Sequence, residues 1–377
     1  MKPNKKLFFF AGEASGDRIG AQLLSQLKEY EKAGVGGPLM RKEAFTCWHP
    51  MEEFQMMGFA QVIKGLFKLR RQFKAIKKEI LEFQPDACIL IDYPGFNLRL
   101  AKLLRKAGYK GKIIQYVSPT VWVWGKGRIK TLEKYFDHLL TILPFEKELF
   151  SHTSLPVTYV GHPTGEAISK TPRDHAREEN LLALFPGSRF VEIERNYALQ
   201  LELAKRLKEE FKEVRIAISC QNPDYRSHLI EKARGVFKES EFEIIPAEKS
   251  YSLMQRANAS IAKSGTVTLE LGLYQVPSVV VYELDLFNRL FAQYLLRLKI
   301  PLVSMTNILL NKEVFPEFVT KPHTPEGIYE SLRVLWPNTE KRRALQNDLE
   351  ELQKMVGQDA SQRAGELVQS LIESQAS

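Results

Sequence analysis

Short apolar segments alternate with longer amphipathic ones along most of the chain. The apolar segments are four to six residues long and rich in Val, Ile, Leu and Phe, which is typical of buried parallel strands. The first series of predicted strands is Leu7–Ala11, Cys88–Asp92, Lys112–Val117, Leu139–Leu143 and Val157–Val160. The second series is Leu181–Phe185, Val214–Ser219, Phe242–Ile245, Ala259–Ala262 and Ser278–Tyr282. Between many of them the spacing predicts amphipathic helices, such as Glu192–Phe211 and Tyr251–Ala257. This alternation predicts parallel sheets with right-handed crossovers.

The two series of strands are separated by Gly161–Thr171, a stretch that contains Pro, Gly and Thr. We therefore predict an α/β protein with two Rossmann-like domains that face each other across a cleft. The expected domains are residues 1–165 and residues 166–339. The segment Thr339–Ile372 is charged and low in β propensity, and it predicts one or two helices.

Composition narrows the class of protein. The chain has 377 residues, of which 44% are hydrophobic and 26% charged, as in soluble globular proteins. We predict no signal peptide, and no apolar stretch approaches the roughly 20 residues of a membrane-spanning helix. Cys47, Cys88 and Cys220 are widely spaced, which favours reduced thiols in the cytoplasm. Neither the cysteines nor the histidines have metal-ligand spacing, so we predict no metal and no cofactor.

The formal net charge of +9 suggests three classes of partner. These are nucleic acid, an anionic membrane and phosphorylated small molecules. The position of the basic residues decides among them.

The first predicted strand runs directly into a turn of small residues, Ala11-Gly12-Glu13-Ala14-Ser15-Gly16-Asp17, and then into a helix. Such a junction directs free backbone N–H groups and the positive end of the helix dipole at a ligand. Glycine is also needed simply to turn a chain tightly, so an α/β loop without a ligand is an equal alternative. The candidate residues in this turn are Gly12, Glu13, Ser15, Gly16 and Asp17.

Two loops in the second half have features of phosphate-binding turns. Pro186-Gly187-Ser188-Arg189 follows a strand, and the guanidinium of Arg189 can hold a phosphate with two parallel hydrogen bonds. Ser264-Gly265-Thr266 follows another strand and opens a helix on which Glu270 lies one turn further, placed to accept both hydroxyls of a ribose. Hydroxyl groups there can instead cap the helix. Because both loops follow strands of the same half, they favour a nucleoside-diphosphate site.

Asp92 ends the buried strand of the first half and precedes Pro94-Gly95. A carboxylate at the carboxyl end of a strand can act as a general base toward a hydroxyl. The alternative is an aspartate that caps the next turn. The following strand leads into a loop with Trp122 and Trp124 beside Lys126 and Arg128, and core packing explains one of these tryptophans more easily than two.

A basic amphipathic helix is predicted over Val62–Phe83. Its apolar stripe is Val62, Leu66, Leu69, Phe73, Ile76 and Ile80. Its other faces carry Lys64, Lys68, Arg70, Arg71, Lys74, Lys77 and Lys78. This pattern favours an anionic membrane interface, where each nearby cation adds roughly 1 kcal/mol of attraction. The alternative is a surface helix packed on the sheet. The candidate acceptor and membrane residues are Val62, Leu66, Lys68, Leu69, Arg70, Arg71, Phe73, Ile76 and Trp122.

Five segments then occur in a characteristic order. They are Ala11-Gly12-Glu13-Ala14-Ser15-Gly16-Asp17, Tyr116-Val117-Ser118-Pro119 with Val121-Trp122, Leu143-Pro144-Phe145-Glu146, Pro186-Gly187-Ser188-Arg189 and Ser264-Gly265-Thr266. Together they resemble the lipid-A-disaccharide synthases, inverting glycosyltransferases of the GT-B fold. The resemblance runs from about Leu7 to the last helices, and with it we expect the helices of residues 340–377 to join the N-terminal domain.

The resemblance implies UDP-2,3-diacylglucosamine as donor and 2,3-diacylglucosamine 1-phosphate (lipid X) as acceptor, with a β-1,6-linked disaccharide 1-phosphate and UDP as products. Asp92 matches the proposed catalytic base, although Gly95 stands where a second Asp is often found. Arg189, Thr266 and Glu270 match donor-side positions. Asn307 lies in a segment that the resemblance places near the nucleotide.

The resemblance also implies a peripheral enzyme at the inner face of the cytoplasmic membrane, since both substrates carry acyl chains. The apolar stretch Leu284–Leu298 favours a homodimer. The alternatives are another GT-B lipid glycosyltransferase, a UDP-sugar epimerase and a basic module that binds nucleic acid. The last is disfavoured because the positive charge is interleaved with apolar residues on one helix.

Overall fold

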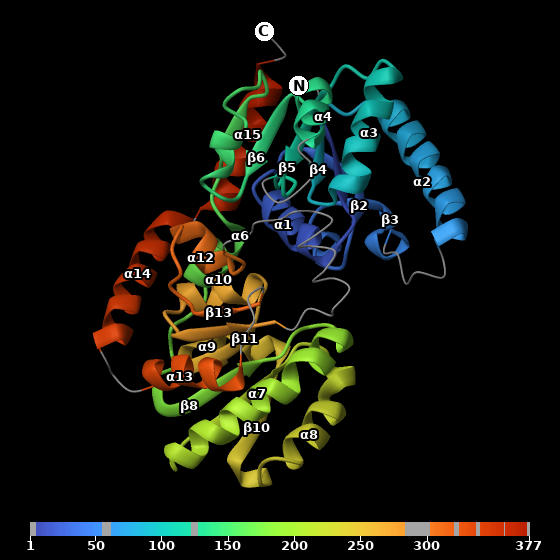
Figure 1. The fold of residues 1–377 in the computed structure, drawn as a ribbon. Coiled ribbons are helices and arrows are strands. Elements are labelled where there is room, and N and C mark those ends of the chain that lie inside the picture. The colour runs from blue at the N-terminus through green and yellow to red at the C-terminus, as the bar shows by residue number, and fades with distance from the viewer. Residues whose placement is uncertain are drawn as a thin grey trace. The chain divides into compact units, whose positions relative to one another are not determined.

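The computed structural model describes residues 5–54, 62–121, 127–282, 302–319, 324–336, 340–357 and 359–374, with side chains from residue 70 onward in the helix that starts at Val62. The chain forms two compact units (Figure 1). Unit 1 is Met1–Glu166 with Gly357–Ser377, and unit 2 is Ala167–Val356. Each unit is built on one parallel sheet, which confirms the predicted pair of Rossmann-like α/β domains. All ten predicted strands are present.

The sheet of unit 1 has seven parallel strands in the order β3-β2-β1-β4-β5-β6-β7. They are β1 (Lys6–Ala11), β2 (Glu31–Gly36), β3 (Thr46–Pro50), β4 (Ala87–Ile91), β5 (Lys112–Tyr116), β6 (His138–Thr141) and β7 (Val157–Tyr159). The direction in which strands are added reverses between β1 and β4, which lie side by side. In open α/β sheets, ligands bind beyond the carboxyl ends of the strands at such a switch point.

Alternate side chains of β1 face opposite sides of the unit 1 sheet. Phe8 and Phe10 pack into a core with the helices α2, α3 and α4, whereas Leu7 and Phe9 pack into a second core with α1 and α15. The helices of unit 1 are α1 (Ala14–Leu24), α2 (Val62–Phe83), α3 (Pro94–Lys106), α4 (Gly127–Tyr135), α5 (Glu146–Leu149) and α15 (Ala360–Glu373). The helix α6 (Pro163–Ser169) spans the division between the units.

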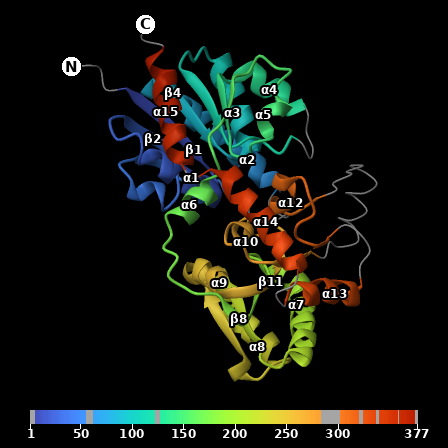
Figure 2. The same cartoon turned by 90° about the vertical axis from the view of Figure 1, so that its left-hand side faces the viewer.

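The C-terminal helix α15 belongs to unit 1 and lies beside α1 (Figure 1, Figure 2). Its apolar face, with Val368 and Ile372, is buried in the α1 core. Gly365 packs so closely that a Cβ there would lie 2.8 Å from the Cβ of Gln26. At the start of α15, the backbone N–H and the hydroxyl of Ser361 donate to the buried carboxylate of Glu166 at 2.7 and 2.6 Å.

The helix α14 (Glu340–Val356) belongs to unit 2, which corrects the expectation that all of residues 340–377 join the N-terminal domain. The helix packs closely on α10 (Thr266–Leu273) because Gly272 has no side chain, and Leu352 Cδ2 lies 2.6 Å from where a Cβ of Gly272 would stand. The Gln353 side chain also donates a hydrogen bond to the carbonyl of Leu273.

The sheet of unit 2 has six parallel strands in the order β10-β9-β8-β11-β12-β13. They are β8 (Glu178–Phe185), β9 (Arg215–Cys220), β10 (Phe242–Pro246), β11 (Ala257–Lys263), β12 (Ser278–Val281) and β13 (Glu317–Phe318). The helices are α7 (Phe190–Glu210), α8 (Arg226–Arg234), α9 (Ser250–Arg256), α10 (Thr266–Leu273), α12 (Met305–Leu310), α13 (Pro325–Leu335) and α14. Here the switch point lies between β8 and β11, which pair directly.

Candidate active site

At the switch point of unit 1, a hydroxyl and a carboxylate from neighbouring strand ends are in contact. Ser15 lies in the first turn of α1, after β1, and Asp92 follows β4 directly. Ser15 Oγ donates a hydrogen bond of 2.8 Å to Asp92 Oδ2. Both side chains are half-buried, so the carboxylate is oriented by the protein and still accessible. The structure therefore brings together two of the residues that the sequence singled out separately.

The backbone around Asp92 is strained. Asp92, Tyr93 and Val117 have positive φ angles of 50°, 47° and 72°, and each such conformation of a non-glycine residue costs on the order of 1–3 kcal/mol. The strain is held by neighbours: the N–H of Asp92 donates to the carbonyl of Tyr116 at 2.8 Å. The carbonyl of Asp92 accepts from Gln115 Nε2 at 3.1 Å and from the amide of Asn97. Strain that is fixed in this way is typical of a functional site.

The glycine turn packs against the residue that follows Asp92. A Cβ on Gly12 would lie 2.9 Å from the Tyr93 ring, and one on Gly16 would lie 3.4 Å from the Cβ of Ala11. Tyr93 is fixed in turn by a hydrogen bond of 2.9 Å from its hydroxyl to the carbonyl of Phe54. Glu13 is exposed at the start of α1. Gly12 thus allows the turn to lie close to Tyr93, directly after Asp92, whereas a Cβ on Gly16 would make only an ordinary van der Waals contact.

Asp17 has a structural role that the sequence did not indicate. Its carboxylate is buried and accepts hydrogen bonds from the backbone N–H groups of Gly37, Leu39 and Met40 at 2.9, 2.9 and 3.0 Å. These three hydrogen bonds attach the carboxylate to the loop after β2. Asp17 therefore holds that loop onto α1 and is no longer among the residues we expect to contact a ligand.

At the switch point of unit 2, the buried carboxylate of Glu192 connects the two predicted phosphate-binding loops. Glu192 lies in the first turn of α7, and its Oε2 accepts the backbone N–H of Ser188 at 3.1 Å. Its Oε1 lies 3.1 Å from Nζ of Lys263, the last residue of β11. Gly187 has a φ of 131°, and a Cβ there would lie 2.7 Å from the Cβ of Glu192. Glycine is therefore required at position 187.

The sequence pattern alone did not indicate Lys263 or the role of Glu192. The available signal was a charged residue at the end of an otherwise uncharged strand, together with a carboxylate three residues after Arg189. Burial alone would raise the pKa of the Glu192 carboxyl, but Lys263 and the N–H groups of Ser188 and Arg189 hold the pKa below its usual range. Glu192 is therefore ionised at neutral pH, as the counter-charge of Lys263.

The remaining donor-side candidates are exposed or half-buried around this pair. Arg189 has 83% of its side chain exposed, with Nη1 3.7 Å from Glu192 Oε1. Ser188 and Thr266 are also exposed. Glu270 is half-buried and accepts a long hydrogen bond of 3.4 Å from the hydroxyl of Tyr251. This edge of the sheet thus presents a guanidinium, two hydroxyls and a carboxylate.

Ser264 and Asn307 are engaged inside unit 2. Ser264 Oγ donates to the carbonyl of Val303 at 3.3 Å. The fully buried amide of Asn307 donates to the Phe315 carbonyl and the Glu317 carboxylate, both at 2.7 Å. The Asn307 Oδ1 accepts the N–H groups of Val314 and Phe315 at 2.9 and 2.8 Å. With all its polar atoms engaged, Asn307 stabilises the segment around α12 and is not placed to contact a nucleotide directly.

The predicted membrane stripe on α2 is part of the core where the structure describes its side chains. Phe73 and Ile76 are buried, and the Phe73 ring stacks on Phe96 at a centroid distance of 4.2 Å. This corrects their assignment as membrane-contacting residues, because they pack between α2 and α3. Arg70 and Arg71 are exposed. The side chains of Val62, Leu66, Lys68 and Leu69, the residue Trp122 and the stretch Leu284–Leu298 lie outside the described residues.

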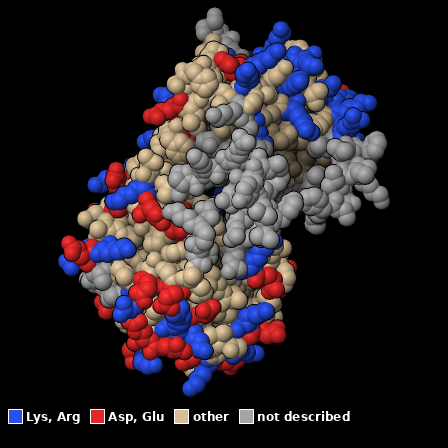
Figure 3. All heavy atoms as spheres, viewed as in Figure 1, with Lys and Arg blue, Asp and Glu red and all other residues tan. Residues whose placement is uncertain are grey.

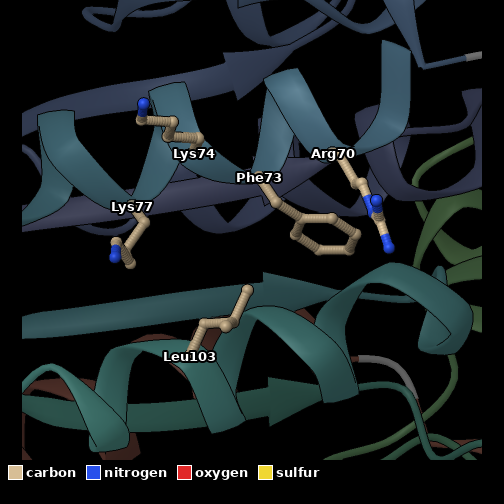
Figure 4. Close-up of a pocket in the computed structure, with 5 residues that line it drawn as sticks. All are labelled: Arg70, Phe73, Lys74, Lys77 and Leu103. Atoms are coloured by element: carbon tan, nitrogen blue, oxygen red, sulfur yellow. The ribbon is translucent and has the colours of Figure 1, made fainter. Parts of the chain in front are cut away.

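Basic side chains gather over α2 and α3 on the face of unit 1 shown in Figure 3. Between these helices lies a cavity of about 250 Å³, lined by Arg70, Phe73, Lys74, Lys77 and Leu103. In Figure 4 the Phe73 ring and the side chains of Arg70 and Lys77 extend from α2 toward α3. The described part of this face is therefore cationic, with an apolar floor.

The ranges that the structure describes contain neither a candidate metal site nor a helix able to cross a membrane. Within those ranges, no three His, Cys, Asp or Glu side chains are grouped so that they could hold a metal ion. Likewise, none of the helices described is both long and apolar enough to cross a membrane.

The family model of lipid-A-disaccharide synthetase matches residues 7–371. The chain belongs to the lipid-A-disaccharide synthetase family. It is 40% identical to a lipid-A-disaccharide synthase of Chlamydia pneumoniae over 94% of this chain and 61% of that protein. It is 33% identical to one of Blochmanniella pennsylvanica over 96% of this chain and 95% of that protein. The chain thus spans about three fifths of the chlamydial relative's length.

Solved structures with much lower sequence identity share the fold. The Acinetobacter baumannii MurG structure has a TM-score of 0.62 and 15% identity, with 98% of this chain and 100% of that chain covered. A UDP-GlcNAc 2-epimerase from Neisseria meningitidis, solved with UDP-GlcNAc bound, has a TM-score of 0.61 and 10% identity, with 98% and 100% covered. These likenesses confirm the GT-B-like fold expected of the lipid-A-disaccharide synthetase family.

Proposed function

We propose that the protein transfers 2,3-diacylglucosamine from UDP-2,3-diacylglucosamine to 2,3-diacylglucosamine 1-phosphate, forming the β-1,6 disaccharide 1-phosphate and UDP. Family membership supports this reaction. The observation that supports the chemical step is the hydrogen bond from Ser15 to Asp92, which orients an accessible carboxylate at the switch point of unit 1. An inverting transfer needs a base of this kind at the acceptor hydroxyl.

In this proposal Asp92 is the general base. Its carboxylate takes the proton of the acceptor 6′-hydroxyl while the hydroxyl oxygen attacks the anomeric carbon of the donor. The new C–O bond forms as the bond from the anomeric carbon to the diphosphate breaks, and the electron pair leaves with UDP. Ser15 keeps one carboxylate oxygen hydrogen-bonded, so that the other is free to accept the proton.

Unit 2 binds the donor in this proposal. Arg189 is exposed beside the start of α7 and offers two parallel hydrogen bonds to a phosphate. The N–H groups around Gly265 and Thr266, at the start of α10, add to the charge stabilisation of the departing UDP, and no metal is required. Glu270, one turn along α10, accepts the ribose hydroxyls. Ser188 and Thr266 supply hydroxyl groups to the phosphates.

Apolar contacts for the acyl chains of the donor are available next to Arg189. Phe190 and Val191 are 43% and 57% exposed, an unusual exposure for large apolar side chains in the described residues. Phe190 rests against the rings of Tyr225 and His228. The sugar that carries the acyl chains is bonded directly to the diphosphate. Residues beside the phosphate-binding arginine are therefore suited to contact those chains.

The exposed cations of α2, among them Arg70 and Arg71, would attract the protein to the anionic inner face of the cytoplasmic membrane, where both lipid substrates reside. The protein acts as a homodimer in this proposal, which light scattering of the purified protein would test. No nucleic acid is required as a partner.

The deciding experiment measures UDP release from UDP-2,3-diacylglucosamine in mixed micelles containing EDTA, with and without the acceptor. We expect release that depends on the acceptor and is unaffected by EDTA. Equal release without acceptor, or isomerised donor in its place, would contradict the transfer. Loss of release in EDTA that Mg²⁺ restores would contradict the metal-independent mechanism alone.

A further inference from the structure

The ammonium group of Lys263 lies between the two phosphate-binding loops of unit 2. Lys263 is the last residue of β11 and is followed directly by Ser264-Gly265-Thr266. Its Nζ lies 3.1 Å from Glu192 Oε1 and 5.2 Å from the centroid of the Tyr282 ring. It also lies 3.4 Å from where a Cβ of Gly265 would stand. The charge is thus directly beside the loop whose N–H groups open α10.

This lysine is held in place and still accessible. About 20% of its side chain is exposed, whereas only 9% of the Glu192 side chain is. The ion pair therefore has a buried anion and a partly solvated cation. A ligand that approaches the switch point meets the ammonium group before it meets the carboxylate.

The charges of the neighbouring side chains favour the binding of an anion. Glu192 is one carboxylate between two cations, Lys263 at 3.1 Å and Arg189 at 3.7 Å, and it also accepts the N–H of Ser188. Among these three side chains of the described part of the chain, one positive charge is left over before any ligand binds. A low-dielectric environment strengthens the attraction of such an excess charge for a multiply charged phosphate group.

We propose that Lys263 binds the diphosphate of the nucleotide donor and that Glu192 is a positioning residue, which holds the ammonium group and the Ser188 N–H in place. This inference rests on the proposed function. When the anomeric carbon–oxygen bond breaks, negative charge develops on the β-phosphate oxygen, and the Lys263 ammonium stabilises it without transferring a proton. Lys263 thus contacts the leaving group, together with Arg189.

The test compares two ligands in the full-length protein, UDP by calorimetry and uridine by an NMR titration. We expect Lys263→Met to weaken UDP binding roughly 10- to 100-fold, the usual range for a lost charge-assisted hydrogen bond. Uridine binding stays within about twofold, since uridine has no phosphate. Lys263→Arg keeps the charge and recovers most of the UDP affinity. Lys232→Met, at an exposed lysine of α8, is the matched control and leaves both affinities unchanged.

Lys263→Met alone leaves the buried Glu192 carboxylate without its counter-charge and can destabilise unit 2. The double variant Glu192→Gln with Lys263→Met removes both charges and keeps an acceptor for the Ser188 N–H. We expect it to fold and to show the same selective loss of UDP binding. Glu192→Gln alone keeps the cation, so it loses less UDP affinity than Lys263→Met.

The outcomes separate this inference from the proposed function. A wild-type protein that does not bind UDP would contradict the proposed function itself. A wild-type protein that binds UDP, with Lys263→Met and the double variant binding it equally well, would overturn the role of Lys263. Equal losses for UDP and uridine would overturn it too, because they would show a purely structural effect.

Discussion

Ser15 Oγ donates a hydrogen bond of 2.8 Å to Asp92 Oδ2, between the ends of two neighbouring strands whose paired residues, such as Ala11 and Ile91, are 80 positions apart in the sequence. The contact joins the glycine turn after β1 to the strained backbone after β4. It gives Asp92 one occupied and one accessible carboxylate oxygen. This is the arrangement that a base acting on a neutral hydroxyl requires.

Asp92→Asn should reduce the transfer rate by about 10²- to 10⁴-fold, the usual contribution of a positioned general base. The amide still accepts the hydrogen bond of Ser15, so folding and UDP affinity should be retained. Ser15→Ala should reduce the transfer rate by about tenfold, because it removes the hydrogen bond that orients the Asp92 carboxylate. Steady-state kinetics and UDP calorimetry on the same samples check both effects. Loss of UDP binding in Asp92→Asn would place the residue in the donor site.

Arg189→Ala should weaken UDP binding roughly 10- to 100-fold, through the loss of charge-assisted hydrogen bonds to phosphate. Its side chain is 83% exposed and its contact with Glu192 is long, at 3.7 Å, so the thermal stability should change little. Arg189→Lys should recover only part of the affinity, since an ammonium lacks the planar fork. Calorimetry with UDP measures this series, and unchanged affinity in Arg189→Ala would contradict the phosphate role.

Truncating the buried residues of α2 should destabilise the protein. Ile76→Ala should cost about 2–5 kcal/mol in the free energy of unfolding, because it leaves a cavity between α2 and α3. The exposed pair Arg70→Glu and Arg71→Glu should instead leave stability within about 0.5 kcal/mol. The same pair should weaken binding to anionic vesicles, by roughly 1 kcal/mol per cation removed. Urea unfolding and vesicle sedimentation separate the two effects. An unchanged unfolding midpoint in Ile76→Ala would contradict the assignment of this residue to the core.

Asn307→Ala should cost about 3 kcal/mol or more of stability, because it leaves the N–H groups of Val314 and Phe315 and the Phe315 carbonyl without their partner. Asn222→Ala, which removes a single hydrogen bond at the start of a short 3₁₀ turn, should cost only about 1 kcal/mol and serves as the control. Urea unfolding measures both. If Asn307→Ala kept its stability and lost only UDP affinity, the amide would contact the donor after all.

His162 should make the protein sensitive to acid. Burial, with Arg18 nearby, lowers the pKa of this imidazole to about 4, from 6.5 in the unfolded chain. Between pH 6.5 and 4 the unfolded state therefore binds a proton that the folded state does not, so stability falls as the pH falls through this window. Across this window the free energy of unfolding falls by about 3 kcal/mol. His162→Asn keeps an acceptor for the N–H of Thr164 and should flatten the pH dependence of the urea midpoint.

The strands that carry the site could be predicted because polar residues follow their apolar segments directly. Asp92 and Arg189 each stand just beyond a strand, and the rule that ligands bind at the carboxyl ends of strands then selects them. The contact between Ser15 and Asp92 could not be predicted from spacing, since it depends on which strands are neighbours. For the same reason the pairing of Glu192 with Lys263 became visible only once β8 and β11 were seen to be adjacent.

The strand β2 was missed because its sequence, Glu31–Gly36, has two glycines and a lysine and lacks the usual β-branched pattern. Gly34 has a φ of 142°, and a Cβ there would lie 2.1 Å from the Phe9 carbonyl oxygen, so the close approach of β1 requires glycine. Lys32 is buried in the strand because its Nζ donates to the Leu27 carbonyl at 2.8 Å. Periodicity could likewise predict α14 as a helix but not the unit on which it packs.

Unit 1 is assembled from both ends of the chain, with Ser361 and the apolar face of α15 supplying part of its interior. During synthesis the ribosome therefore makes every residue of unit 2 before it makes the last helix of unit 1. The usual vectorial order, in which the first unit completes first, is reversed here. Until α15 emerges, nascent unit 1 exposes the apolar surface of α1, and in that interval it is a natural substrate for chaperones.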